Sequence, residues 1–282
     1  MSVLKASIPA LLGAIAVAAS PRGDAAGAVA SPSAVQLEQA FQVLHSAAFV
    51  DLTHDFGTDS PHWKGFAPET VTTLYTIARD GFHAEAFCHP GQWGTHVDPP
   101  AHFHEGLKTV DQIDPREFML RLVVLDIHEQ VARNPDYVVS MTDVLAWEKK
   151  HGAIPKESFV ALRTDWSKRW HDPAAMQNAD ARGVAHYPGW SKEVLQYLYE
   201  KRQVTASGHE TTDTDPGVAV TRDDYSLERY VLGTNHFQIE LLAHLDAVPE
   251  AGALVLVSFP KPRDGSGFPA RVVALVPHAG RG

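Results

Sequence analysis

The chain has 282 residues, of which 44% are apolar and 21% charged, a balance typical of a soluble globular protein and not of a disordered or membrane-spanning one. A formal net charge of −10, without a lysine- or arginine-rich run, leaves no positive footprint for a nucleic-acid backbone, so neither nucleic acid nor membrane is an expected partner. Cys88 is the single cysteine, so any metal must be held by histidine, carboxylate or amide groups.

The N-terminal residues 1–30 predict an export signal. Lys5 precedes fourteen uncharged, small or apolar residues (6–19), and Ala-x-Ala cleavage candidates follow at 16–18 and 28–30. The run is too short for a membrane span, which needs about twenty apolar residues. We expect a periplasmic or secreted protein. The alternative is a disordered, alanine-rich tail on a cytoplasmic one.

The rest of the chain alternates between strand and helix patterns. A helix is expected from Val35, where apolar residues recur at helical spacing, and a polar, Gly- and Pro-containing loop over 54–70 follows a first strand at 49–52. Thr142 can cap a helix over 143–151, and Ser191 can cap one over 192–202. Further strands are expected at 71–78, 121–127, 159–164, 204–207, 238–242, 253–259 and 271–276. This order predicts a single mixed α/β domain over residues 35–282.

One stretch, GQWGTHVDPPAHFH at 91–104, concentrates the candidate chemistry. In an extended segment, residues i and i+2 point to the same side, so His96 and Asp98 can converge on one ion. Pro99 and Pro100 prevent a helix and fix the direction in which His102 is presented. The alternative is that these histidines cap turns or bind core carbonyls. A second His-x-Asp, at 244–246, lies in a leucine-rich segment, and we interpret it as structural.

The pattern Gly94-Thr-His-x-Asp-x-Pro-x-His-Phe103 resembles the signature of the cyclase family, which includes the kynurenine formamidases (arylformamidases) and the isatin hydrolases. The likeness extends over most of the chain after residue 45, with later matches at 208–215, 240–246 and 259–277. It implies a swivelling β/β/α fold and metal-dependent hydrolysis of an amide C–N bond in formamides or small cyclic amides.

The resemblance also implies roles for single residues. His96 and Asp98 match metal ligands, and His102 matches the catalytic histidine. Glu240 falls where a distal ligand is expected, with Gln238 as a less favoured substitute. Water on the divalent ion would attack the carbonyl carbon, with His102 as general acid and base.

One position departs from the family pattern. The residue four before His96, a histidine ligand in the family, is Gln92, whose amide oxygen can still ligate. An oxygen-rich set would favour manganese over zinc. Two-metal members use a further histidine; Glu228 stands roughly where it would be, so we expect one ion, manganese or zinc.

The sequence says less about which residues contact the substrate than about which bind the metal. Trp93, Trp63 and Phe82 are candidate aromatic walls for a flat small-molecule substrate, although aromatic residues more often belong to the core. His209 and Glu210 follow a short strand and fit either a supporting role at the site or a polar turn.

The sequence is compatible to different degrees with three functional classes. The first is a metal-dependent amidohydrolase, acting on a cyclic amide or an aryl formamide, and by family analogy a homo-oligomer. The second is a non-catalytic metal- or ligand-binding member in which Gln92 marks a decayed site. A serine or cysteine hydrolase is disfavoured, because no Gly-x-Ser-x-Gly occurs and His89 beside Cys88 does not establish a dyad.

Overall fold

The computed structural model describes residues 31–278, which fall into two units that divide between Val43 and Leu44. Helix α1 (Ala34–His45) begins where a helix was predicted, but none of its residues is buried. The second unit therefore starts about nine residues after the expected domain start at 35. The predicted export signal lies outside the described residues. Among residues 31–278, no helix is both long and apolar enough to cross a membrane.

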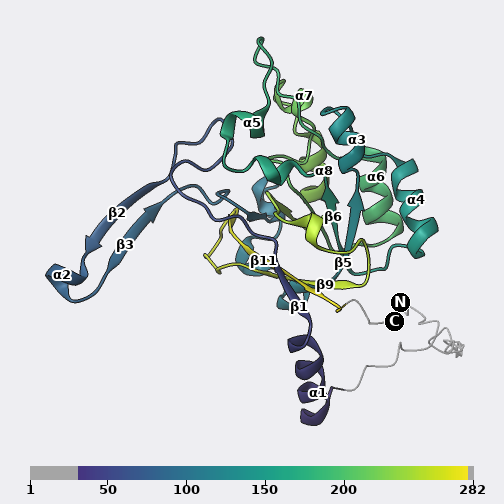
Figure 1. The fold of residues 1–282 in the computed structure, drawn as a ribbon, viewed down its shortest axis with the longest axis horizontal. Helices are drawn as coiled ribbons and strands as arrows, with labels where there is room; N and C mark the ends of the chain where they lie inside the picture. The colour runs from purple at the N-terminus through teal and green to yellow at the C-terminus, as the bar shows by residue number, and fades with distance from the viewer. Residues whose placement is uncertain (1–30, 279–282) are drawn as a thin grey trace, which may run out of the picture. The chain divides into compact units, whose positions relative to one another are not determined.

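The second unit is built on a nine-stranded mixed sheet in the order β1-β11-β9-β5-β6-β7-β8-β4-β10 (Figure 1). Strands β5 to β8 run parallel, and the strands on either side of this group pair antiparallel. A separate antiparallel ribbon is formed by β2 and β3. The bounds are β1 Ala48–Asp51, β2 Thr70–Tyr75, β3 Ala84–Cys88, β4 His96–Asp98, β5 Met119–Asp126, β6 Ser158–Arg163, β7 Ala206–His209, β8 Phe237–Glu240, β9 Ala253–Ser258, β10 Phe268–Pro269 and β11 Arg271–Val276.

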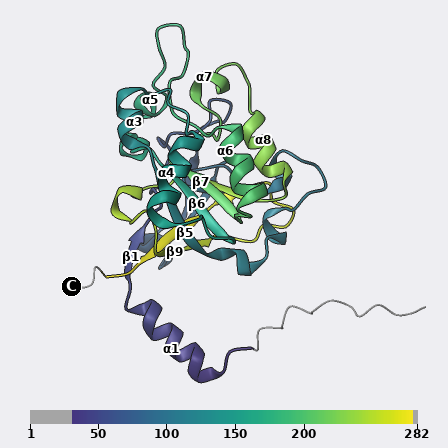
Figure 2. The same ribbon diagram turned by 90° about the vertical axis from the view of Figure 1, so that its right-hand side faces the viewer.

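Helices cover one face of the parallel strands, and Figure 2 shows α4, α6 and α8 in front of them. Ser191 caps α6 as predicted, accepting a hydrogen bond from the Val194 amide. Helix α4 begins earlier than predicted because Ser140 and Asp143, not Thr142, form its capping box. The bounds are α2 Ile77–Asp80, α3 His128–Arg133, α4 Met141–His151, α5 Pro173–Gln177, α6 Lys192–Gln196, α7 Gly217–Val220 and α8 Ser226–Gly233.

The strand alternation divides the core into two layers. On β5, Val123 and Leu125 pack in the cluster under the helices, whereas Leu122 and Val124 pack in a second cluster on the other face. Strands from both ends of the sheet contribute to that second cluster, since the sheet curls. Both faces of the central strands are thus buried, as in parallel sheets generally. The predicted mixed α/β architecture is confirmed.

Candidate metal centre and cavity

Two short strands bring the candidate ligands together. Strand β4 pairs antiparallel with β8, so that His96 stands opposite Glu240 and Asp98 opposite Gln238. Gly94, with φ of 61°, turns the chain into β4 in a conformation that suits glycine. The Pro99–Pro100 pair then ends the strand. The glycine before β4 and the two prolines after it therefore fix where His96 and Asp98 lie on the sheet.

His96 has the geometry of a metal ligand. Its Nδ1 lies 2.8 Å from the Gly94 carbonyl oxygen, so the ring proton sits there and Nε2 carries the lone pair. Nε2 is buried, has no hydrogen-bond partner among the described residues, and lies 3.4 Å from Asp98 Oδ2 and 3.5 Å from Glu240 Oε2. One ligand atom from each of these residues lies within 4.8 Å of the others. The donor set fits a divalent cation, because a buried imidazole nitrogen without a hydrogen-bond partner and two carboxylate oxygens lie close enough to bind one ion.

The surrounding carboxylates are crowded. Burial, and after it the carboxylates of Glu228 and Asp98, raise the pKa of Glu240 well above its usual range. Burial and the same Asp98 raise the pKa of Glu228. Burial opposes ionisation of Asp98 too, but His96, His102 and Gln92 together outweigh it and lower the pKa of Asp98. So many buried like charges are costly without a cation to balance them.

A second, overlapping group lies beside the first. Asp98, His102 and Glu228 also offer ligand atoms within 4.8 Å of one another. Glu228 comes from the first turn of α8, and Asp215 fixes that turn by accepting hydrogen bonds from the amides of Leu227 and Glu228, at 2.9 and 3.0 Å. The position where a family histidine was expected thus holds a carboxylate directed into the same site.

His209 supports Glu240. The Trp190 indole donates to His209 Nδ1 at 3.3 Å, so the ring proton is on Nε2, which lies 3.2 Å from Glu240 Oε1. Burial lowers the pKa of His209 to about 3, so the ring is neutral at physiological pH. Glu210, in contrast, is bound by the Thr164 amide and hydroxyl and by Ser167, and has a structural role.

Gln92 meets the site through its amide nitrogen. Nε2 donates to the Ser266 carbonyl at 2.7 Å and to Asp98 Oδ1 at 3.2 Å, and it lies 3.3 Å from His102 Nδ1. Ligation through the amide oxygen, the predicted role, would require the amide to turn over and lose the bond to Ser266. The hydrogen bonds therefore favour a residue that holds Asp98 in place.

Gln238, the alternative distal ligand, is likewise placed as a donor. Its Nε2 lies 3.0 Å from Glu240 and 3.2 Å from Glu228, while its oxygen accepts from the Thr214 hydroxyl at 2.7 Å. Glu240 is therefore the better distal ligand of the two.

The candidate ligands open onto a cavity of about 350 Å³. Of the three predicted substrate contacts, Trp63 lines it, but Trp93 is fully buried against His62 and does not. Phe82 lies in the turn of the β2–β3 ribbon, packed on Tyr75, and does not line the cavity either. Sequence reasoning overlooked other residues of the wall. The lining residues are Trp63, Phe66, Gln92, His96, His102, Phe103, Thr212, Asp213, Tyr225, Glu228, Glu240 and Leu241.

His102 lines this cavity with a half-buried ring. It ends a short 3₁₀ helix, Pro100–His102, that begins immediately after β4. Its Nε2 lies 3.9 Å from Glu228 Oε1. Burial lowers the pKa of His102 more strongly than Asp98 raises it, which favours the neutral, proton-accepting imidazole near pH 7.

Comparison with known proteins agrees with this geometry. The profile of the family described as "Putative cyclase" matches residues 50–216. The isatin hydrolase of Roseibium aggregatum is 34% identical over 191 residues, which cover 66% of this chain and 72% of that protein.

Solved structures of isatin hydrolases superpose closely. Isatin hydrolase A from Ralstonia solanacearum is 31% identical, with a TM-score of 0.79 over 88% of this chain and 99% of that one. Another isatin hydrolase, bound to the product analogue thioisatinate, is 28% identical, with a TM-score of 0.79 over 88% of this chain and all of that one (100%).

Proposed function

The chain belongs to the cyclase family, and from that premise we propose that it is a metal-dependent amidohydrolase that opens the C–N bond of a small cyclic amide, with isatin as the leading candidate. The observation that carries the proposal is the orphaned Nε2 of His96, which faces Asp98 and Glu240 at the base of a cavity that His102 also lines. A non-catalytic role would not explain a neutral, accessible histidine beside the ligand set.

His96, Asp98 and Glu240 would hold the ion, with His209 orienting Glu240. When bound there, a divalent ion would lower the pKa of water toward neutrality and polarise the substrate carbonyl. This donor set has one nitrogen and two carboxylate oxygens, so we propose manganese before zinc. We also propose one ion per chain, because His102 is then free for proton transfer.

His102 would carry the protons of the reaction. As a neutral imidazole it takes a proton from the attacking water while the new C–O bond forms, and it returns that proton to the nitrogen as the amide C–N bond breaks. The Gln92 amide nitrogen donates to Asp98 Oδ1, so it would hold this ligand in place beside His102.

The cavity suits a flat substrate. Trp63, Phe66 and Phe103 supply aromatic walls, and Phe103 packs edge-on against His102 with ring centres 4.9 Å apart. A planar bicyclic amide such as isatin matches both the walls and a volume of about 350 Å³.

The direct test is turnover by protein reconstituted with manganese or zinc, with elemental analysis of the same samples. Isatin, N-formylkynurenine and a hydantoin separate cyclic amides from aryl formamides. We expect isatin to be the best substrate, with about one ion per chain. Uptake of the ion without hydrolysis of any of the three would support the binding-protein alternative and refute the proposal.

Location and assembly are proposed on sequence grounds. We propose that residues 1–30 direct export and are removed, which N-terminal sequencing of protein from a fractionated host tests directly. A mature chain that keeps Met1 and stays in the cytoplasm would refute this. We propose a homo-oligomer by family analogy, to be tested by sedimentation velocity.

A further inference from the structure

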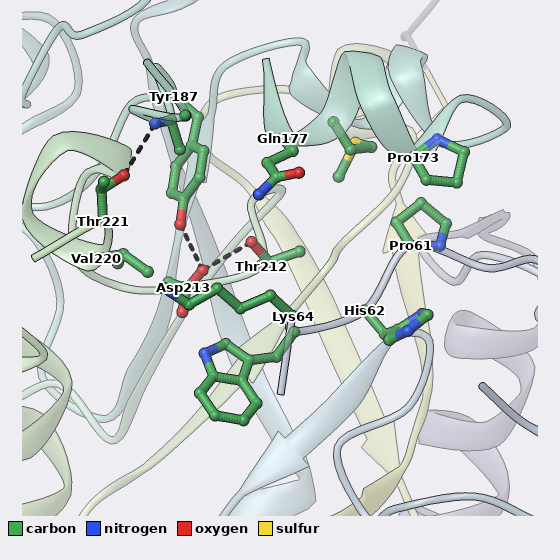
Figure 3. A pocket seen from close by; sticks show the side chains of 14 residues that line it. Pro61, His62, Lys64, Pro173, Gln177, Tyr187, Thr212, Asp213, Val220 and Thr221 are labelled. Carbon is green, nitrogen blue, oxygen red and sulfur yellow. Dashed lines mark hydrogen bonds between the residues drawn. The ribbon is translucent and has the colours of Figure 1, made fainter. Parts of the chain in front are cut away.

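A second cavity adjoins the one above the candidate ligands. It has a volume of about 170 Å³ and shares three residues with its neighbour, Trp63, Thr212 and Asp213. Figure 3 shows it from close by, with Tyr187 and Asp213 on one side and Pro61 and Pro173 on the other. The two cavities therefore adjoin each other, and these three residues form the wall that lies along both.

The aromatic part of this wall is held in place. The Trp63 indole nitrogen donates to the Tyr225 hydroxyl at 2.9 Å, and the ring packs edge-on against Phe66 with centres 5.1 Å apart. Gly65 permits this, because a Cβ at that position would overlap the Trp63 ring. Trp63 is thus held in one orientation beside both cavities.

The polar part of the wall is an oriented carboxyl group. Asp213 Oδ2 accepts hydrogen bonds from the Tyr187 hydroxyl at 2.6 Å and the Thr212 hydroxyl at 2.7 Å (Figure 3). Oδ1 has no hydrogen-bond partner within residues 31–278, and the residue is 5% exposed. Two donors on one oxygen therefore leave the other as an acceptor at the junction of the cavities.

The charges around Asp213 favour a cation or a hydrogen-bond donor. Within the described part of the chain, the lining of the first cavity, which Asp213 shares, contains no lysine or arginine that could occupy the free oxygen of Asp213. The cation on the outer edge, Lys64, lies 3.6 Å from Asp223, so its charge is partly balanced. Between these ends the second cavity is walled by the apolar side chains of Pro61, Met176 and Val220.

We propose that the second cavity is a subsite of the same active site, which takes a short substituent on the aromatic ring of the amide substrate. Its Asp213 Oδ1 binds an ammonium or another hydrogen-bond donor on that substituent. The inference rests on the proposed function and narrows its substrate class to ring-substituted cyclic amides with a small cationic or donor head.

Calorimetry can test the subsite without turnover. Oxindole has the lactam ring but lacks the second carbonyl that activates isatin, so it serves as a poorly reactive ligand. We would compare aminomethyl- and ethyl-substituted oxindoles, which have the same shape, at each of the aromatic ring positions on the metal-loaded protein. At one position at least, the aminomethyl compound should bind about tenfold more tightly, the effect of one hydrogen bond to a charged group.

Asp213→Asn is the decisive variant. It keeps an oxygen for Tyr187 and Thr212 but turns the free acceptor into a donor, so the aminomethyl preference should disappear. Gln177→Trp, at the exposed rim, should narrow the cavity and weaken both substituted compounds relative to plain oxindole. Metal content and melting temperature would verify that each variant is folded.

The outcomes separate the two proposals. Equal binding of the two compounds at every position, or a preference that Asp213→Asn leaves intact, would overturn the subsite. Isatin turnover by the unaltered protein tests the proposed function independently. Selective binding without turnover of isatin, N-formylkynurenine or the hydantoin would therefore refute the function and keep the subsite.

Discussion

Replacing His102 with alanine distinguishes a proton carrier from a metal ligand. His102 is outside the His96–Asp98–Glu240 set, yet it lines the same cavity and belongs to the overlapping set with Asp98 and Glu228. If it only moves protons, His102→Ala should lower kcat by about 10²–10⁴-fold, the usual contribution of a general acid–base. That loss corresponds to about 3–5 kcal/mol in the barrier. Metal content should stay near one ion per chain.

The assay pairs steady-state hydrolysis of isatin with elemental analysis of the same preparation. His96→Ala is the contrasting variant, because it removes the only nitrogen from the three-residue set, and it should lose both the ion and turnover. His104→Ala is the matched control. It lies in the same loop but hydrogen-bonds the Arg229 carbonyl at 2.8 Å and does not line the cavity, so both readouts should be retained.

Two results would refute this reasoning. Loss of metal in His102→Ala would assign His102 to the ligands, through the set that contains Glu228. Unchanged kcat with the ion in place would show that another group carries the proton.

Four further results are expected. His209→Ala should weaken metal affinity by about 10–100-fold in competition with a chelator, because Glu240 loses the donor that orients it. Asp215→Ala should lower the free energy of unfolding by about 1 kcal/mol, measured by denaturant titration, because two amides at the start of α8 lose their acceptor. The kcat/KM should fall as pH drops through the lowered pKa of His102, with a midpoint below 6.5, because protonation removes the base; a midpoint above 6.5 would contradict this assignment. Chelation of an ion present at about 100 times its Kd should remove about 2.7 kcal/mol and lower the melting temperature by about 5–10 °C, measured by calorimetry.

Local patterns were sufficient for most strands. The apolar run of β5 reads clearly because both faces of a central parallel strand are buried, and Ser191 starts α6 because capping depends on residues three apart. The short strand β4 was not predicted as such, although its extended geometry was. Three residues carry too little pattern, and β4 exists because β8 and β10 lie on either side of it.

Candidate site residues could be predicted in two cases: where their spacing along the chain is short, and where the family resemblance covers their position. His96 and Asp98 share a face because they are two apart on a strand, which sequence alone reveals. Glu240 followed from the resemblance, whereas the reason it meets His96 is the β4–β8 register, a pairing across more than a hundred residues. The role of His209 could not be decided for the same reason. A polar residue that follows a strand gives the same sequence pattern in a turn as in a functional site.

Gln92 shows why a residue's identity does not settle its role. An amide can ligate through oxygen or donate through nitrogen, and sequence cannot choose between them. The choice is made by the Ser266 carbonyl, which comes from the distant segment before β10 and takes the nitrogen at 2.7 Å. That anchor leaves the other amide hydrogen for Asp98 Oδ1, at 3.2 Å. A glutamine at this position can therefore hold the candidate ligand Asp98 instead of binding a metal itself, which is compatible with an active site and does not require a decayed one.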